Sequence, residues 1–171
     1  MKKIFVLILV SVILMSCGSP FDTTMKSDEY RIEVLSSWES VEWEGYDVFL
    51  RPEDKQANAN VKIYTKSSAE IKWGRITEIT EDYDKKAVET YGYTLESDGY
   101  EFVPQAQREQ RYYINFVTEQ NGMTFKIIQH IYATNSMAVY VTGTYIGGDK
   151  TLEGQVKDTM DSFLLAPKKG W

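Results

Sequence analysis

RYYINFVTEQNGMTFKIIQHIYATNSMAVYVTGTY, residues 111–145, is the stretch that decides the fold of this 171-residue chain. Apolar and polar residues alternate in it with period two, which is typical of half-buried β-strands. Three runs show this pattern: Arg111–Thr118, Thr124–Ala133 and Met137–Tyr145. Asn121-Gly122 joins the first two runs, and these residues readily adopt the positive φ angles of a type I′ turn. The stretch therefore predicts an antiparallel meander.

Further strands are expected on the N-terminal side of the meander. Short β-rich runs lie at Tyr30–Leu35, Tyr46–Leu50, Val61–Thr65, Tyr93–Glu96 and Tyr100–Val103. Ser97-Asp98-Gly99 has the composition of a turn, so the last two runs are expected to form separate strands.

Two segments have helical periodicity. Between Ser68 and Tyr91, apolar residues recur at roughly helical spacing, and charged residues occupy the other positions. After Gly147-Gly148, Asp149 or Thr151 can cap a second helix. Its apolar face is formed by Leu152, Val156, Met160, Phe163 and Leu164. Strands and helices in this order predict an α+β fold in which helices cover one mostly antiparallel sheet.

The N-terminus has the pattern of an export signal. Lys2 and Lys3 precede an apolar run that is shorter than the ~20 residues needed to span a bilayer. The sequence Leu14-Met15-Ser16-Cys17 resembles a bacterial lipobox. We expect residues 1–16 to be removed and Cys17, the single cysteine, to carry lipid. The alternatives are an uncleaved anchor and an ordinary secretory signal.

Lipidation would hold the protein on a cell membrane or outer membrane, with its folded part outside the cytoplasm. Residues 17–29 are expected to form a flexible lipidated tether, 30–166 the folded domain and 167–171 a C-terminal tail. Loss of Lys2 and Lys3 with the signal would change the formal net charge from −6 to −8. An acidic chain is unsuited to nucleic acid, whose binding needs clustered Lys and Arg.

The chain resembles the PsbP-like superfamily, in particular the DcrB-type bacterial lipoproteins of unknown function. The resemblance covers residues 30–165. It rests on Tyr30-Arg31-Ile32 running into Trp38, on the strands and helix that follow, on Tyr112-Tyr113-Ile114-Asn115-Phe116, and on Met160-Asp161-Ser162-Phe163. It implies an α-β-α sandwich with helices on both faces of the sheet. It also implies a binding or assembly module without a common active site.

No catalytic or metal-binding set is evident in the sequence. His130 is the single histidine and is interpreted as a structural or exposed strand residue. Ser162 lacks the glycine-rich elbow of a serine nucleophile. Glu78, Glu81, Asp82 and Asp84 are interpreted as the wet face of a helix, because they lack the spacing of a calcium loop. We therefore expect a protein that is not an enzyme and that uses no cofactor or metal.

Aromatic residues are the better functional signal. Trp43 and Trp73 have charged or glycine neighbours, which indicates partial exposure, and tryptophan is frequent in interface hot spots. The leading hypothesis is a lipid-anchored domain that binds a protein partner in the cell envelope through these residues. The alternative is a carrier or sensor that holds a small apolar or amphipathic ligand between sheet and helix.

Overall fold

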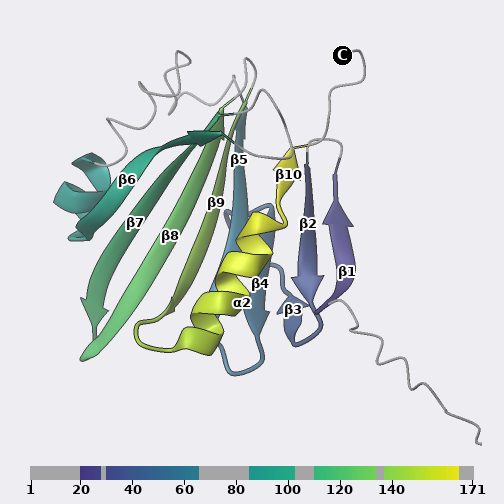
Figure 1. The fold of residues 1–171 in the computed structure, drawn as a ribbon, viewed down its shortest axis with the longest axis horizontal. Coiled ribbons are helices and arrows are strands. Elements are labelled where there is room, and N and C mark those ends of the chain that lie inside the picture. The colour runs from purple at the N-terminus through teal and green to yellow at the C-terminus, as the bar shows by residue number, and fades with distance from the viewer. Residues whose placement is uncertain (1–19, 28–29, 66–84, 103–109, 134–136, 166–171) are drawn as a thin grey trace, which may run out of the picture.

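The computed structural model describes residues 20–27, 30–65, 85–102, 110–133 and 137–165. Within these ranges, ten strands form two antiparallel sheets (Figure 1). The small sheet has the order β1-β2-β10, with β1 at Phe21–Lys26, β2 at Tyr30–Leu35 and β10 at Leu164–Leu165. The large sheet has the order β3-β4-β5-β9-β8-β7-β6. Its strands are β3 Trp38–Ser40, β4 Val48–Pro52, β5 Ala57–Thr65, β6 Thr94–Phe102, β7 Gln110–Gln120, β8 Met123–Ala133 and β9 Met137–Ile146.

The expected α+β sandwich, with helices on both faces of one sheet, is wrong. The protein is mostly antiparallel β-sheet, and among the described residues only α2 (Lys150–Asp161) and residues 85–91 are helical. The α-β-α sandwich implied by the PsbP-like resemblance is corrected in the same way. The physical reason is that β1 and β10 pair with the two edges of β2. β2 therefore belongs to a second sheet, which occupies the place expected for a helical layer.

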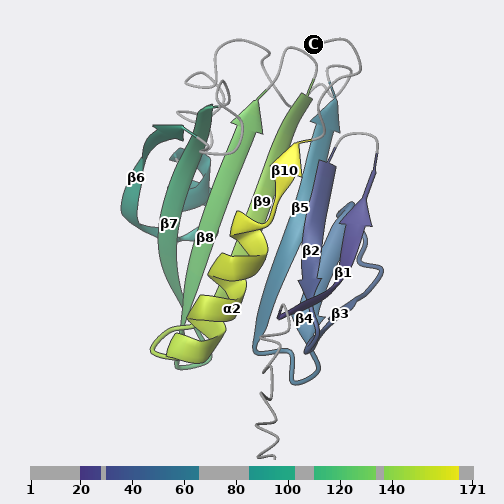
Figure 2. The same ribbon diagram turned by 45° about the vertical axis from the view of Figure 1, so that its right-hand side comes forward.

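One face of the large sheet is covered jointly by the small sheet and α2, which lie side by side (Figure 2). α2 contacts β9, β5 and β2. Gly143 on β9 permits this approach, because an added Cβ would lie 2.2 Å from Val156 Cγ1 and 2.5 Å from Met160 Sδ. The helix and two strand layers thus share one apolar core.

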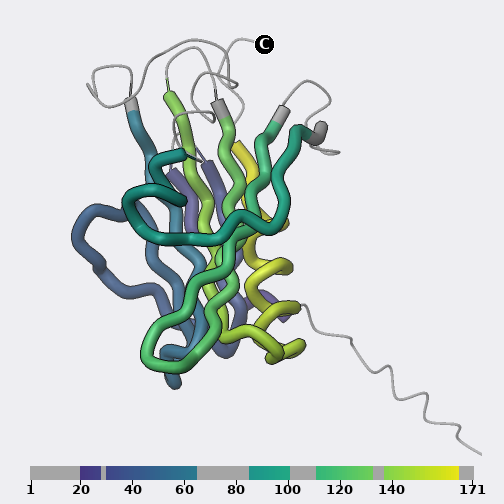
Figure 3. Tube along the Cα trace, turned by 90° about the vertical axis from the view of Figure 1, so that its left-hand side faces the viewer, coloured from purple at the N-terminus to yellow at the C-terminus, as the bar shows by residue number. Residues whose placement is uncertain are grey.

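The opposite face carries a second apolar cluster. Tyr112, Ile114 and Phe116 of β7 point to this face because they alternate with residues of the first face. Ala87 packs against them from the helical residues 85–91, on the other side of the large sheet from α2 (Figure 3). The remainder of the helix expected from Ser68 lies outside the described residues.

The two strands expected around Ser97-Asp98-Gly99 are one strand, β6. Its register with β7 shifts between Leu95 and Ser97, which marks a β-bulge that continues the strand through the expected turn. Gly99 is needed for close approach, because a Cβ there would lie 2.8 Å from the Tyr113 hydroxyl. The expected turn is therefore wrong, and Gly99 instead permits side-chain packing across the sheet.

The flexible tether expected over residues 17–29 contains an ordered strand. Phe21–Lys26 form β1, which pairs with β2, and the Ser36 N–H donates to the Pro20 carbonyl. The folded part therefore begins within a few residues of Cys17. The sequence pattern did not predict β1, because four of its six side chains are exposed and its sequence is mostly polar.

Two local predictions are confirmed. Asn121 and Gly122 have φ angles of 53° and 75°, as the type I′ hairpin between β7 and β8 requires. Asp149 is the N-cap of α2, and its carboxylate accepts from the N–H groups of Thr151 and Leu152. The turn and the N-cap each depend on a few neighbouring residues, so both can be predicted without knowledge of the tertiary structure.

Candidate functional site

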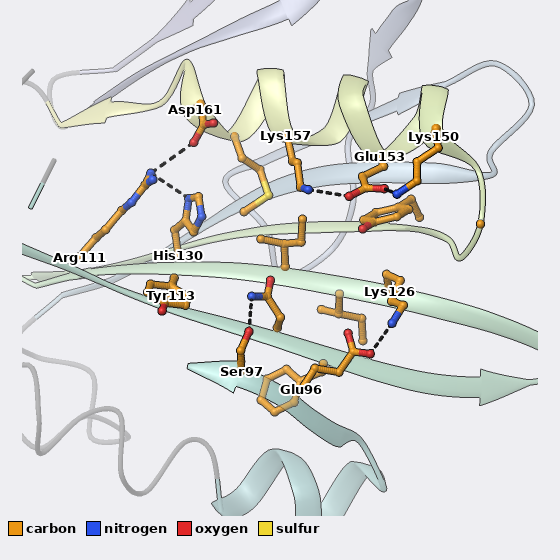
Figure 4. Close-up of a pocket in the computed structure, with 17 residues that line it drawn as sticks. Glu96, Ser97, Arg111, Tyr113, Lys126, His130, Lys150, Glu153, Lys157 and Asp161 are labelled. Carbon is orange, nitrogen blue, oxygen red and sulfur yellow. Dashed lines mark hydrogen bonds and ion pairs between the residues drawn. The ribbon is translucent and has the colours of Figure 1, made fainter. Parts of the chain in front are cut away.

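A polar groove of about 560 Å³ lies along α2 on the first face of the large sheet. The small sheet packs in one core with β3, β4 and β5. Beyond α2, the described lining of the groove comes mainly from β6, β7 and β8. Side chains of these strands form the floor of the groove, and one side of α2 forms its wall (Figure 4). We call it the α2 groove.

The alternation of side chains along each strand determines which residues form the floor of the groove. Tyr113 and Asn115 of β7 are opposite His130 and Ile128 of β8, so all four side chains share one face. The Asn115 Nδ2 donates to the Ser97 Oγ of β6 at 2.8 Å. The floor consequently presents hydroxyl and amide groups around a small apolar centre.

Arg111 occupies one end of the α2 groove. Its Nη1 lies 3.2 Å from His130 Nδ1, and it also contacts the Tyr132 hydroxyl at 3.3 Å and Asp161 Oδ1 at 3.4 Å. The Arg111 side chain is only 15% exposed, whereas that of Asp161 is 62% exposed. One nitrogen is thus shared among three acceptors at distances beyond the usual 2.7–3.2 Å or at its upper limit.

His130 contributes no charge to the α2 groove near neutral pH. Burial is the larger cause and the adjacent Arg111 guanidinium the smaller one, and together they lower the pKa of His130 to about 3. The side chain is buried on β8, at 7% exposure. A neutral Nδ1 that accepts from Arg111 leaves the ring proton on Nε2. His130 is therefore a buried structural residue of the strand that also positions Arg111.

Ion pairs line the other end. Lys126 of β8 pairs with Glu96 of β6, and Glu153 of α2 accepts from Lys150 at 2.7 Å and from Lys157 at 2.6 Å. The hydrogen bonds from Lys150 and Lys157 lower the pKa of Glu153 to about 2. Glu153 is thus ionised throughout the physiological range.

A second feature lies on the opposite face of the large sheet. Trp43 is 52% exposed and Tyr46 is 43% exposed, and both contact Phe49 of β4. The Trp43 and Phe49 rings are stacked with centroids 4.9 Å apart, and Tyr46 meets Phe49 edge-on at 5.7 Å. Gly45, with φ of +88°, allows the turn that returns Tyr46 toward the strand. We call Trp43, Tyr46 and Phe49 the aromatic patch.

The aromatic patch has aromatic neighbours from a distant part of the sequence. Burial raises the pKa of Tyr93, and the phenols of Tyr46 and Tyr91 contribute to this rise, which means that both act on Tyr93 electrostatically. The Tyr91 and Tyr93 rings are 5.7 Å apart, and Tyr91 is 56% exposed. The exposed aromatic surface therefore extends from the residues before β4 to the end of helical residues 85–91.

The structure places only some of the residues singled out by sequence. Trp43 is exposed, as its charged neighbours indicate, and it belongs to an aromatic cluster. Trp73, Cys17 and the acidic residues 78–84 lie outside the described residues. Ser162 is the C-cap residue of α2, and its hydroxyl donates to the Thr159 carbonyl at 2.6 Å and accepts from the Glu33 N–H at 3.0 Å.

A ligand between sheet and helix was an alternative expected from the sequence, but the sequence did not identify the residues that line the α2 groove. The available signal was the polar alternation of Arg111, Tyr113 and Asn115 in an otherwise apolar run. The prediction treated His130 as isolated because its partner Arg111 is 19 residues away and meets it only through the β7–β8 pairing.

Neither a metal-binding cluster nor a membrane-spanning helix is present in the part of the chain that the structure describes. That part holds no group of three His, Cys, Asp or Glu side chains arranged to bind a metal ion. None of its helices combines the length and the apolar character required to cross a bilayer.

Comparisons with known proteins show similarity of fold. No family model and no curated protein matches the chain. LpqN, a protein involved in cell envelope biogenesis in Mycobacterium tuberculosis, is similar in structure, with a TM-score of 0.57, 9% identity and 88% coverage of both chains. A Bacteroides thetaiotaomicron VPI-5482 structure gives a TM-score of 0.49 at 15% identity over 83% of this chain. The match spans 46% of that longer chain. The comparisons do not show the PsbP-like family.

Proposed function

We propose that this protein is a lipid-anchored domain of the bacterial cell envelope that binds a protein partner through the aromatic patch. The observation that carries the proposal is the ring packing of Trp43, Phe49 and Tyr46 on an exposed face. Rings already held by their neighbours lose little conformational entropy on binding, and they bury a large area. The patch is therefore suited to serve as an interface hot spot.

The fold comparison supports the cellular setting of this proposal. LpqN has a similar fold and is involved in cell envelope biogenesis. The lipobox-like sequence before Cys17 independently predicts an envelope location for this chain. Shared fold does not transfer function, so the partner must be identified by experiment.

The lipid anchor is tested by Cys17→Ser. Four peptide links separate Cys17 from Phe21, the first residue of β1, which corresponds to at most about 14 Å. Loss of the acylated thiol should leave the chain unprocessed, or release it from the detergent phase of a detergent-partitioning experiment. Mass spectrometry of the mature N-terminus provides the direct readout. An unmodified Cys17 in the wild-type chain would refute the anchor.

Partner binding is tested by crosslinking in the native envelope. A photoreactive amino acid in place of Glu44, which is exposed beside the aromatic patch, should give a discrete protein adduct. Trp43→Ala should lower the adduct yield about tenfold or more, because hot-spot truncations cost 2 kcal/mol or more. Trp43→Phe should retain much of the yield.

Met123→Ala is the matched control, because Met123 is 44% exposed but lies at the β7–β8 hairpin, away from the aromatic patch. Its adduct yield should equal that of the wild type. The proposal fails if no discrete adduct forms at position 44, or if Trp43→Ala and Met123→Ala give equal yields.

The alternative function, a carrier of a small ligand, is favoured by the size of the α2 groove. Its volume is within the 300–1,000 Å³ of common ligand sites. An apolar or amphipathic ligand was expected from the sequence, and the charged residues at both ends of the groove disfavour a purely apolar one. A carrier role for this site therefore requires a polar ligand.

A further inference from the structure

We infer that the α2 groove is a binding site for a small polyhydroxylated anion, such as a sugar that carries a carboxylate or a phosphate group. The site is distinct from the aromatic patch, because the two lie on opposite faces of the large sheet. The inference is independent of the proposed protein partner. It rests on the charge of the lining, on the contacts of Arg111 and on the neutral groups of the floor.

The charge of the described lining is positive, although the chain is acidic. Cations exceed carboxylates by one in the groove, whereas the whole chain has a formal net charge of −6. The cations are Arg111, Lys126, Lys150 and Lys157, and the carboxylates are Glu96, Glu153 and Asp161. An excess of one cation in the lining of an acidic protein favours an anionic ligand at this place over the rest of the surface.

Arg111 is the group best placed to hold the anion. Its side chain is largely buried, and the buried His130 and the Tyr132 hydroxyl hold its Nη1 from the protein side. The third acceptor, Asp161, is mostly exposed and lies at 3.4 Å. A ligand carboxylate or phosphate can approach to 2.7–2.9 Å and form stronger, charge-assisted hydrogen bonds. Asp161 can then turn to solvent.

Lys157 is a second cation that can contact the anion, and it faces the α2 groove from the wall. It is held by Glu153, which it shares with Lys150, so one carboxylate serves two ammonium groups. Lys157 lies one helical turn before Asp161, on the same side of α2 (Figure 4). Arg111 and Lys157 thus approach the same space from the floor and from the wall.

The neutral side chains of the floor are suited to contact hydroxyl groups of a ligand. Ser97 and Asn115 offer a hydroxyl and an amide close to the Lys126–Glu96 pair. The Tyr113 ring lies against Gly99, where no side chain competes for the space. A sugar ring has hydroxyl groups at its edge and C–H groups on its faces, so it can use both the polar groups and the aromatic ring. The volume of about 560 Å³ accommodates one or two such rings.

Isothermal titration calorimetry on the full chain in detergent tests the inference. The probes are glucuronate, glucose 1-phosphate, glucose and inorganic phosphate. At least one of the two sugar anions should bind at least tenfold more tightly than both glucose and inorganic phosphate. Binding of glucuronate alone assigns a carboxylate ligand, and binding of glucose 1-phosphate alone assigns a phosphate ligand.

Variants locate the binding. Arg111→Gln should weaken binding of the sugar anion at least tenfold, and Lys157→Gln about threefold. Lys85→Gln is the matched control, since Lys85 is 72% exposed in an ion pair on helical residues 85–91, and it should leave affinity unchanged. If Arg111→Gln does not fold, the double variant Lys126→Gln/Lys157→Gln decides, with an expected loss of at least tenfold.

Three results would overturn the inference: no binding of either sugar anion at 10 mM, equal affinity for glucose, or affinity that the groove variants do not change. These results are separable from failure of the proposed function. The crosslinking experiment depends on Trp43, and Arg111→Gln leaves the aromatic patch intact.

Discussion

Phe163→Ala is expected to lower the free energy of unfolding by about 3–5 kcal/mol, the range for truncation of a buried aromatic residue. Phe163 is 1% exposed and directly follows the C-cap residue of α2. Its ring packs on Tyr30 of the small sheet with centroids 5.7 Å apart, and on Tyr132 of the large sheet at 5.0 Å. One side chain therefore joins the helix end to both sheets.

Urea unfolding at neutral pH, followed by tryptophan fluorescence, measures this effect. Phe163→Leu should lose less stability, because leucine fills part of the space. Met123→Ala is the surface control, and its change should be within about 0.5 kcal/mol. A loss below about 1 kcal/mol for Phe163→Ala would mean that the two sheets are not coupled through this residue.

Acid destabilisation through His130 is the second large effect. The pKa of His130 is lowered from its ordinary value of 6.5 to about 3 in the folded protein. Below pH 6.5, His130 therefore binds a proton in the unfolded chain but not in the folded protein. The free energy of unfolding decreases as the pH is lowered. The loss should be about 2 kcal/mol between pH 7 and pH 5, and roughly 4–5 kcal/mol by pH 3.

The groups that face His130 explain why it stays neutral. The Arg111 guanidinium repels a second positive charge on His130. Tyr113 lies opposite His130 on β7, and Tyr132 lies two residues further along β8 on the same face. Asp161, on α2, is bound to Arg111 and is mostly exposed. No carboxylate among the described contacts of His130 compensates its protonation.

His130→Gln tests this prediction, because glutamine can accept from Arg111 but does not titrate. The free energy of unfolding is measured in urea at pH 7, 6 and 5. Between pH 7 and pH 5, the wild type should lose about 2 kcal/mol more than the variant. Equal pH dependence of the two proteins would show that His130 is protonated in the folded state. The range ends at pH 5 because carboxylates titrate below it.

Local sequence signals predicted individual elements well. The β7–β8 hairpin follows from Asn121-Gly122, and α2 follows from its Asp149 cap and apolar face. Strand β2 follows from strict alternation, with Ile32 and Val34 buried. These features depend on backbone conformations and side chains within a few residues, so they can be predicted from the local sequence.

The layer arrangement required long-range pairing. β1 has a polar sequence and β10 has only two residues, so neither has a recognisable pattern of its own. Both strands exist because β2 offers two free edges for hydrogen bonds. The same limit applied at Gly99, where a turn signal in fact permits packing by Tyr113 from the neighbouring strand.

The sequence by itself determined the antiparallel meander, the terminal helix, the acidic character of the chain and the exposure of Trp43, because each depends on composition or local order. Only the tertiary structure decided that two sheets replace a helical layer, and that Arg111, His130 and Asp161 meet beside α2. Strand register and the position of α2 bring these residues together across 50 positions of sequence. Such contacts arise from packing, which no single segment encodes.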